Sequence, residues 1–165
     1  ASDSIAIACH ELASISERRI NQVLDPQWSA QVPFLAKKEG LESGYMIIQY
    51  VAAACIAELH LLANPATTSN VPVSMGKEDH VSMGATGAFR SLQSTELLSQ
   101  VLANELICAT EALDRIPHNP GQGVAGIHHW VREYVGQYSG DTVMSEECTT
   151  LSNQLLDGKL QEIFG

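Results

Sequence analysis

The feature of this sequence that most limits its fold is an uninterrupted helical pattern across residues 85–116. Apolar and small side chains recur there at steps of three and four residues, which places them on one face of an α-helix. The residues that keep this spacing are Ala85, Ala88, Phe89, Leu92, Thr95, Leu98, Val101, Leu102, Glu105, Cys108, Ala109, Ala112, Leu113 and Ile116. A helix this long, with no proline inside it, usually belongs to a helical bundle. Small residues in the apolar stripe allow close helix–helix approach.

Shorter helical patterns precede and follow this one. The expected helices cover residues 5–24, 44–64, 127–138, 144–156 and a last piece that ends at Phe164. Ser14 and Glu17 form a capping-box pattern, which predicts that the first segment breaks into two helical pieces. Asp141 precedes the 144–156 segment and is expected to cap its start.

The patterns together predict an all-α fold in two parts. Residues 1–116 form a long-helix bundle portion that includes a hydroxyl-rich loop at 65–84. Residues 117–165 form a smaller C-terminal helical region, which begins with a flexible stretch rich in proline and glycine. No window shows the sustained alternation of β-branched residues that is typical of strands.

The charge balance excludes some classes of partner. The formal net charge is −10 and the nine basic residues are scattered, whereas binding to a nucleic-acid backbone needs clustered Lys and Arg. No stretch reaches about 18 consecutive apolar residues, so no membrane partner is expected. Residues 1–7 lack the basic start of a signal peptide, and the chain does not begin with Met. We therefore expect a piece of a longer protein with neither a nucleic-acid nor a membrane partner.

The cysteines and the low charge content favour a cytoplasmic protein that associates with itself. Cys9, Cys55, Cys108 and Cys148 lie far apart in the sequence among small apolar residues, and none forms a CxxC pair. This spacing predicts buried free thiols in a reducing cytoplasm rather than a disulfide framework. Only 17% of the residues are charged, which favours a surface partly covered by a partner.

The densest ionisable cluster is Glu78-Asp79-His80, preceded by Lys77, where the 65–84 loop leads into the long helix. One interpretation is a charged helix start, because carboxylates in a first turn are stabilised by the helix macrodipole. The other is functional. Long loops often carry function, and a carboxylate at a loop–helix junction is well placed as a base or as an acceptor for a substrate N–H. The residues alone leave both interpretations open.

Metal and nucleophilic chemistry find little support. Residues 78–80 are adjacent and point in different directions, and His10-Glu11 lacks the second histidine of a helical zinc motif. His128 and His129 likewise diverge around a helix, so no metal site is expected. There is no GxSxG motif, and no cysteine lies in a cationic setting that would lower its pKa.

The run from residue 71 to 84, Val-Pro-Val-Ser-Met-Gly-Lys-Glu-Asp-His-Val-Ser-Met-Gly, resembles the signature of the histidine ammonia-lyases. In that family a loop ending in Glu-Asp-His-Val-Ser-Met leads into a long bundle helix. Further blocks are similar to the family in the same order, at residues 11–19, 24–26, 33–35, 40–47, 131–135 and 156–160. The likeness covers nearly the whole chain, which is therefore identified as resembling the C-terminal part of an aromatic amino acid lyase.

The resemblance implies a lyase of histidine catabolism that eliminates ammonia from L-histidine to give urocanate. In that family a methylidene-imidazolone electrophile forms from an Ala-Ser-Gly tripeptide, and no such tripeptide occurs in these 165 residues. The cofactor and the family's substrate-binding Tyr and Arg residues are therefore expected in a missing N-terminal half. This piece alone is expected to be inactive. The resemblance also implies a homotetramer in which each active site draws on three subunits.

Three residues are assigned to the site by the resemblance. Glu78 stands where the family places a Glu close to the substrate imidazole and the departing β-proton, so we expect it to be catalytic and substrate-binding. Its carboxylate can accept an imidazole N–H, which a phenyl ring cannot supply, so Glu78 favours histidine over phenylalanine. Met46 aligns with a pocket-lining position and offers an apolar wall. Lys77 stands where the family usually has Gln, and its ammonium would favour the charged form of Glu78.

Two other interpretations stay open. The first is a non-catalytic helical scaffold, including a lyase-like protein that has lost its activity. The second is an aromatic amino acid lyase or an aminomutase of other specificity, because Lys77 departs from the histidine pattern next to the most important residue of the site.

Overall fold

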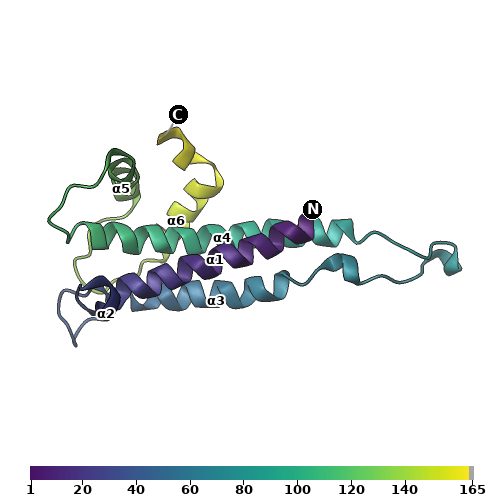
Figure 1. Cartoon of the computed structure of the whole chain (residues 1–165), viewed down its shortest axis with the longest axis horizontal. Coiled ribbons are helices and arrows are strands. Elements are labelled where there is room, and N and C mark those ends of the chain that lie inside the picture. The colour runs from purple at the N-terminus through teal and green to yellow at the C-terminus, as the bar shows by residue number, and fades with distance from the viewer. Residues whose placement is uncertain (164–165) are drawn as a thin grey trace.

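A computed structural model describes residues 1–163 as helices joined by loops, with no β-strand in that range. The three longest helices, α1 (Ser2–Leu24), α3 (Met46–Leu62) and α4 (Gly84–Leu113), lie side by side in an elongated bundle (Figure 1). Two shorter helices, α5 (Gln122–Tyr134) and α6 (Ser145–Leu156), pack against α4. The predicted all-α fold with a long central helix is confirmed.

Short helical turns occupy the connections. They are α2 (Pro26–Ser29), η1 (Pro33–Leu35), η2 (Ala66–Thr68), η3 (Ser74–Gly76) and η4 (Lys159–Ile163). The last turn agrees with the helical piece expected at the end of the chain, whose predicted last residue, Phe164, lies outside the described residues. Helix α5 begins at Gln122, before the expected start at residue 127, so Gly126 lies inside it. A Cβ at Gly126 would lie 3.0 Å from Ile163, so glycine permits the close approach of η4.

The core lies between α1, α3 and α4 and contains both branched and small residues. Its fully buried members include Ala13, Ile20, Ala52, Leu59, Val101, Ala103 and Ile107. Alanine at the crossing points lets the helix backbones approach, as the small residues of the pattern predict. Burying each large aliphatic side chain contributes about 1.5–3 kcal/mol, so this stripe holds the bundle together.

Large apolar side chains also cover the outside of the bundle. Those exposed on its three long helices include Ile5, Leu12, Ile15, Ile47, Tyr50, Leu61, Phe89 and Leu92. Where exposed apolar side chains adjoin one another, they usually mark a region that another protein covers. The segment Met46–Thr68, which contains an 18-residue window with a mean hydropathy of 1.7, could also cross a membrane by its length and composition. The absence of a membrane partner and the self-association of the chain therefore stay predictions.

The capping box predicted within the first helical segment is wrong. Helix α1 is continuous, and the Ser14 hydroxyl donates to the carbonyl of His10 at 2.9 Å instead of capping a new turn. The Glu17 side chain is only 6% exposed and pairs with Arg18. The buried stripe through Ala13 and Ile20 crosses the supposed break, so core packing favours one straight helix over the local capping signal.

The assignment of Asp141 as an N-cap is also wrong, since α6 begins at Ser145. The Asp141 carboxylate instead accepts the N–H groups of Ser43 and Gly44, at 2.8 and 2.9 Å, and the hydroxyl of Tyr138 at 2.7 Å. These hydrogen bonds, led by the one from Ser43, lower the pKa of Asp141. They fasten the C-terminal region to the turn that precedes α3.

We expect Asp141→Ala to lower the melting temperature at pH 7, because the N–H groups of Ser43 and Gly44 lose their acceptor and the Tyr138 hydroxyl keeps only the longer hydrogen bond to Glu42. Since the folded pKa of Asp141 lies below its unfolded value of about 3.9, the charged form stabilises the protein above that pH. This contribution is lost as the pH falls through the folded pKa. The difference in melting temperature between wild type and variant should therefore be steady from pH 7 to 5 and shrink below about pH 4. An unchanged difference at pH 3 would show that the carboxylate charge is not involved.

Candidate functional site

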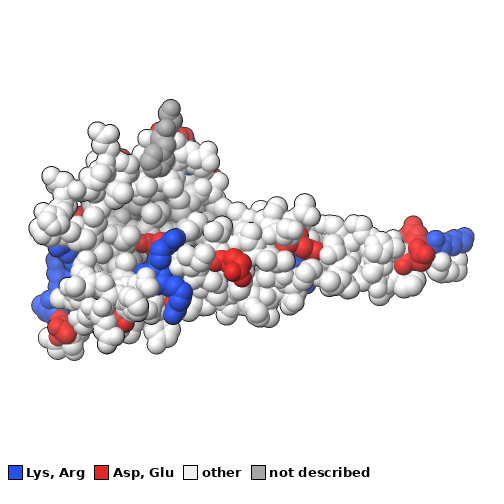
Figure 2. All heavy atoms as spheres, viewed as in Figure 1, with Lys and Arg blue, Asp and Glu red and all other residues white. Residues whose placement is uncertain are grey.

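The loop between α3 and α4 projects beyond the ends of the helices (Figure 1). All residues from 71 to 80 are exposed. Acidic and basic side chains gather at the end of this projection, which is otherwise uncharged on the face in view (Figure 2). The charged residues of this part of the chain are Lys77, Glu78 and Asp79. The loop therefore presents the predicted cluster to its surroundings rather than to its own bundle.

The base of the loop is fastened to the start of α1 by Asp3. Its carboxylate accepts the N–H of Ala66 at 3.0 Å, the N–H of Thr67 at 3.1 Å and the hydroxyl of Thr67 at 2.8 Å. These hydrogen bonds lower the pKa of Asp3, and the one from the N–H of Ala66 has the largest effect. The first turn of the loop, η2, is thus held by a carboxylate from a distant part of the sequence.

The tip of the loop is a tight hairpin closed by Val73 and Glu78. The N–H of Val73 donates to the carbonyl of Glu78 at 2.9 Å, and the N–H of Glu78 donates back at 3.3 Å. Between them Ser74, Met75 and Gly76 have φ values of +54°, +56° and +80°. Two non-glycine residues in the left-handed region are costly, so the hairpin needs support from the rest of the loop.

The Glu78 carboxylate makes no hydrogen bond or ion pair with any residue from 1 to 163, and neither does the ammonium of Lys77. Its oxygens are therefore available to accept donors from a ligand. The alternative interpretation as a charged helix start is wrong. Helix α4 begins at Gly84, six residues later, and has no acidic residue in its first turn.

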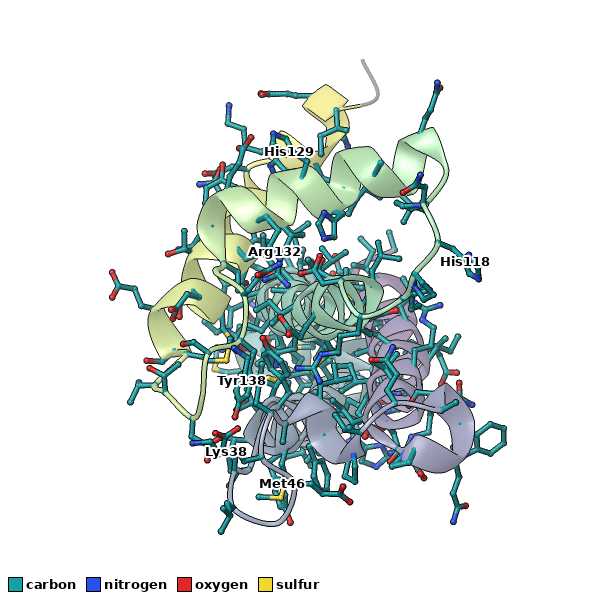
Figure 3. All side chains as sticks on the ribbon, turned by 90° about the vertical axis from the view of Figure 1, so that its left-hand side faces the viewer. Lys38, Met46, His118, His129, Arg132 and Tyr138 are labelled. Atoms are coloured by element: carbon teal, nitrogen blue, oxygen red, sulfur yellow. The ribbon has the colours of Figure 1, made fainter. Side chains whose placement is uncertain are left out.

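Met46 does not lie near Glu78 within one chain. It starts α3, and the 17 residues of that helix span about 25 Å before the loop begins. Figure 3 shows Met46 at the end of the bundle that faces away from the loop. Lys77, in contrast, is the direct neighbour of Glu78. A pocket containing both Met46 and Glu78 would need residues from two different chains.

A groove away from the loop lies along α3, α4 and α6. Its volume is about 730 Å³, and Ile47, Asn104 and Cys148 contribute to its walls. Burial raises the pKa of the Cys148 thiol to about 11, which leaves it protonated and a poor nucleophile at neutral pH. The four cysteines are free, and among residues 1–163 no three metal-binding side chains gather at one place.

A buried charge cluster on α4 and α5 was missed by the sequence analysis. The Glu111 side chain is 6% exposed and pairs with Arg115 at 3.0 Å and Arg132 at 2.8 Å. It also accepts the N–H of Tyr138 at 3.1 Å. Figure 3 shows Arg132 reaching from α5 toward α4, whereas His118 and His129 lie on the outside.

This cluster is structural rather than a candidate site. Burial alone would raise the pKa of Glu111, but hydrogen bonds from Tyr138, Arg115 and Arg132 hold it below its usual range. The second carboxylate, on Asp114, accepts Arg132 at 2.6 Å and contacts His128 at 2.6 Å. With its charges paired inside the protein, the cluster joins α4 to α5 and leaves no carboxylate free for a ligand. No sequence signal marked it beyond the likeness of residues 131–135 to the lyases.

Solved structures define the class to which this fold and loop belong. Histidine ammonia-lyase from Trypanosoma cruzi superposes with a TM-score of 0.93 and 31% identity, over 98% of this chain and 32% of that one. A tyrosine aminomutase from Streptomyces globisporus superposes with a TM-score of 0.94 and 28% identity, over 98% of this chain and 31% of that one. The fold is that of the helical ammonia-lyases and aminomutases.

The sequence comparisons name the family. The aromatic amino acid lyase profile matches residues 1–133, so the chain belongs to the aromatic amino acid lyase family. A histidine ammonia-lyase from an Anaeromyxobacter species is 42% identical over 160 residues, which is 96% of this chain and 32% of the relative. The chain thus spans about a third of the length of the curated relatives it matches. The resemblance found from the sequence is confirmed.

Proposed function

We propose that the protein containing this chain eliminates ammonia from L-histidine and releases urocanate. The observation that carries the proposal is the carboxylate of Glu78, exposed on a closed hairpin and unpaired among residues 1–163, in a chain similar to histidine ammonia-lyases. In the elimination the C–N bond breaks, the β-carbon loses a proton and a C=C bond forms. A carboxylate near the imidazole and the β-carbon supports both recognition and proton transfer.

Glu78 gives the site a physical preference for histidine. An imidazole N–H can donate to the carboxylate, whereas a phenyl ring would leave a desolvated charge without a partner. Sites built to bond a polar substrate group reject analogues that lack it by large factors, because the polar group of the protein is then unpaired.

The prosthetic group of this family, a methylidene-imidazolone, would supply the electrophile that engages the substrate. These 165 residues contain no Ala-Ser-Gly, so we propose that it forms in another part of the protein. An exposed loop tip with a free carboxylate is compatible with a site completed elsewhere. We further propose a cytoplasmic homotetramer in which Glu78 of one chain and Met46 of another meet at one site, since one chain holds them far apart.

The test is an assay of the intact protein with L-histidine. We expect ammonia and urocanate to appear in equal amounts, and we expect no release from the 165-residue chain alone. Failure of the intact protein to release ammonia from histidine would contradict the proposed activity. Activity of the 165-residue chain alone would contradict the proposal that the electrophile lies outside it.

The second candidate is an aminomutase, favoured by the superposition on the tyrosine aminomutase. The same assay with L-tyrosine distinguishes it, because an aminomutase returns the amino group to give a β-amino acid. Formation of that isomer, without urocanate from histidine, would favour the aminomutase. If the intact protein reacted with neither amino acid, the result would favour the interpretation of the chain as part of a non-catalytic helical scaffold.

A further inference from the structure

The neck of the Glu78 loop is closed by one side chain, that of Asn70. Its amide nitrogen donates to the carbonyl of Val81 at 2.5 Å, and its amide oxygen accepts the N–H of Val81 at 3.2 Å. Only one orientation of the amide satisfies both hydrogen bonds. Asn70 and Val81 are half-buried, whereas all of residues 71–80 between them are exposed. A single side chain thus holds the two ends of an exposed segment together.

The Asn70 contact continues the register of the hairpin. Val73 and Glu78 exchange both of their backbone hydrogen bonds across the tip. Asn70 lies three residues before Val73, and Val81 lies three residues after Glu78. Backbone-bonded pairs of an antiparallel ladder recur every second residue, so residues 70 and 81 stand opposite each other at a position without backbone hydrogen bonds. The Asn70 side chain supplies the hydrogen bonds across the loop at this position.

The tip needs such support. Ser74 and Met75 are held in the left-handed region, and neither they nor Glu78 have side-chain partners among residues 1–163. Apart from the Val73–Glu78 pair and the turn inside it, the Asn70 amide provides the described hydrogen bonds across the loop. Loss of this contact would let residues 71–80 move as one flexible segment and Glu78 move with them.

We propose that Asn70 is a positioning residue for Glu78, acting through the backbone of Val81 and the hairpin. This rests on the proposed function of Glu78. Asn70 touches no reacting atom, so its effect is on the placement of the carboxylate. A displacement of about 1 Å in a catalytic group can cost about 100-fold in rate, so loss of the clamp lowers kcat by about 10- to 100-fold. The KM for histidine changes less than kcat.

The test compares Asn70→Ala with Asn119→Ala in the intact protein. Asn119 is an exposed loop asparagine without a side-chain hydrogen bond to residues 1–163, so it controls for loss of an amide. Hydrogen exchange is measured first, because it does not depend on activity. In Asn70→Ala the amides of Val73, Glu78 and Val81 should exchange about tenfold faster, which corresponds to the loss of two modest hydrogen bonds. Unchanged exchange at these amides would overturn the proposal whatever the substrate.

A double-mutant cycle with Glu78→Gln supplies the second readout. If Asn70 acts through Glu78, Asn70→Ala lowers turnover of histidine in wild type but costs less than about threefold in the Glu78→Gln background. Equal losses in both backgrounds would mean a general structural role and would overturn the proposal. If wild type does not turn over histidine, the proposed function fails, and the exchange data still decide whether Asn70 holds the loop.

Discussion

Replacing Glu78 by Gln in the intact protein is expected to lower kcat for L-histidine by about 10²- to 10⁴-fold, the usual contribution of a positioned acid or base. The amide keeps the size and one acceptor oxygen of the side chain but loses its negative charge and its ability to take a proton. Because Glu78 is exposed and its side chain makes no hydrogen bond or ion pair within residues 1–163, the fold should be unaffected. The measurement is steady-state production of urocanate, with hydrogen exchange as a check on the loop.

The matched control is Asp79→Asn, which removes the same charge from the next residue of the exposed loop. We expect it to reduce turnover of histidine by less than about tenfold, because its carboxylate has no part in the proposed contact. If Asp79→Asn abolished turnover while Glu78→Gln preserved it, the catalytic assignment of Glu78 would be wrong.

Replacing Glu111 by Gln is expected to lower the free energy of unfolding by about 3 kcal/mol, the lower end for breaking a buried ion pair. Glu111 is the shared acceptor of Arg115, Arg132 and the Tyr138 amide. In the variant Arg132 keeps its ion pair with Asp114, and Arg115 keeps its hydrogen bond to the carbonyl of Leu35. The expected loss therefore stays below about 5 kcal/mol, the upper end of the range for a broken buried ion pair. Urea denaturation of the variant and wild type measures the difference.

The control for Glu111 is Glu162→Gln. Glu162 pairs with Lys159 at 2.8 Å, but both side chains are largely exposed, so the expected loss is below about 1 kcal/mol. Similar losses in the two variants would mean that the Glu111 cluster contributes no more than a surface ion pair. The account of how α5 is joined to α4 would then be wrong.

The helices could be predicted because their signal is local. The spacing of apolar residues within 85–116 depends only on the period of the helix, and α4 follows it to within a few residues. The capping pattern at Ser14 failed because such a pattern also fits inside a helix, where the hydroxyl bonds to the carbonyl one turn back. The packing of α1 against α3 and α4 favours the continuous helix over a break at Ser14.

The charge cluster and the loop could not be predicted in the same way. Glu111 meets Arg132 and Tyr138 only after α5 has folded back onto α4, and nothing in the local sequence marks that contact. The left-handed Ser74 and Met75 contradict ordinary residue preferences and follow from the closed hairpin. Glu78 was predicted through the family resemblance, whereas Asn70 required coordinates, because its partner is a backbone group eleven residues away.

The most direct test is the position of the Glu78 carboxylate in an experimental structure of the intact protein with bound histidine or urocanate. We expect a carboxylate oxygen within about 2.6–3.2 Å of an imidazole nitrogen, with Met46 of a different chain in the pocket wall. A ligand bound with its imidazole paired to another residue, and Glu78 in solvent, would contradict the assignment of this loop to the active site.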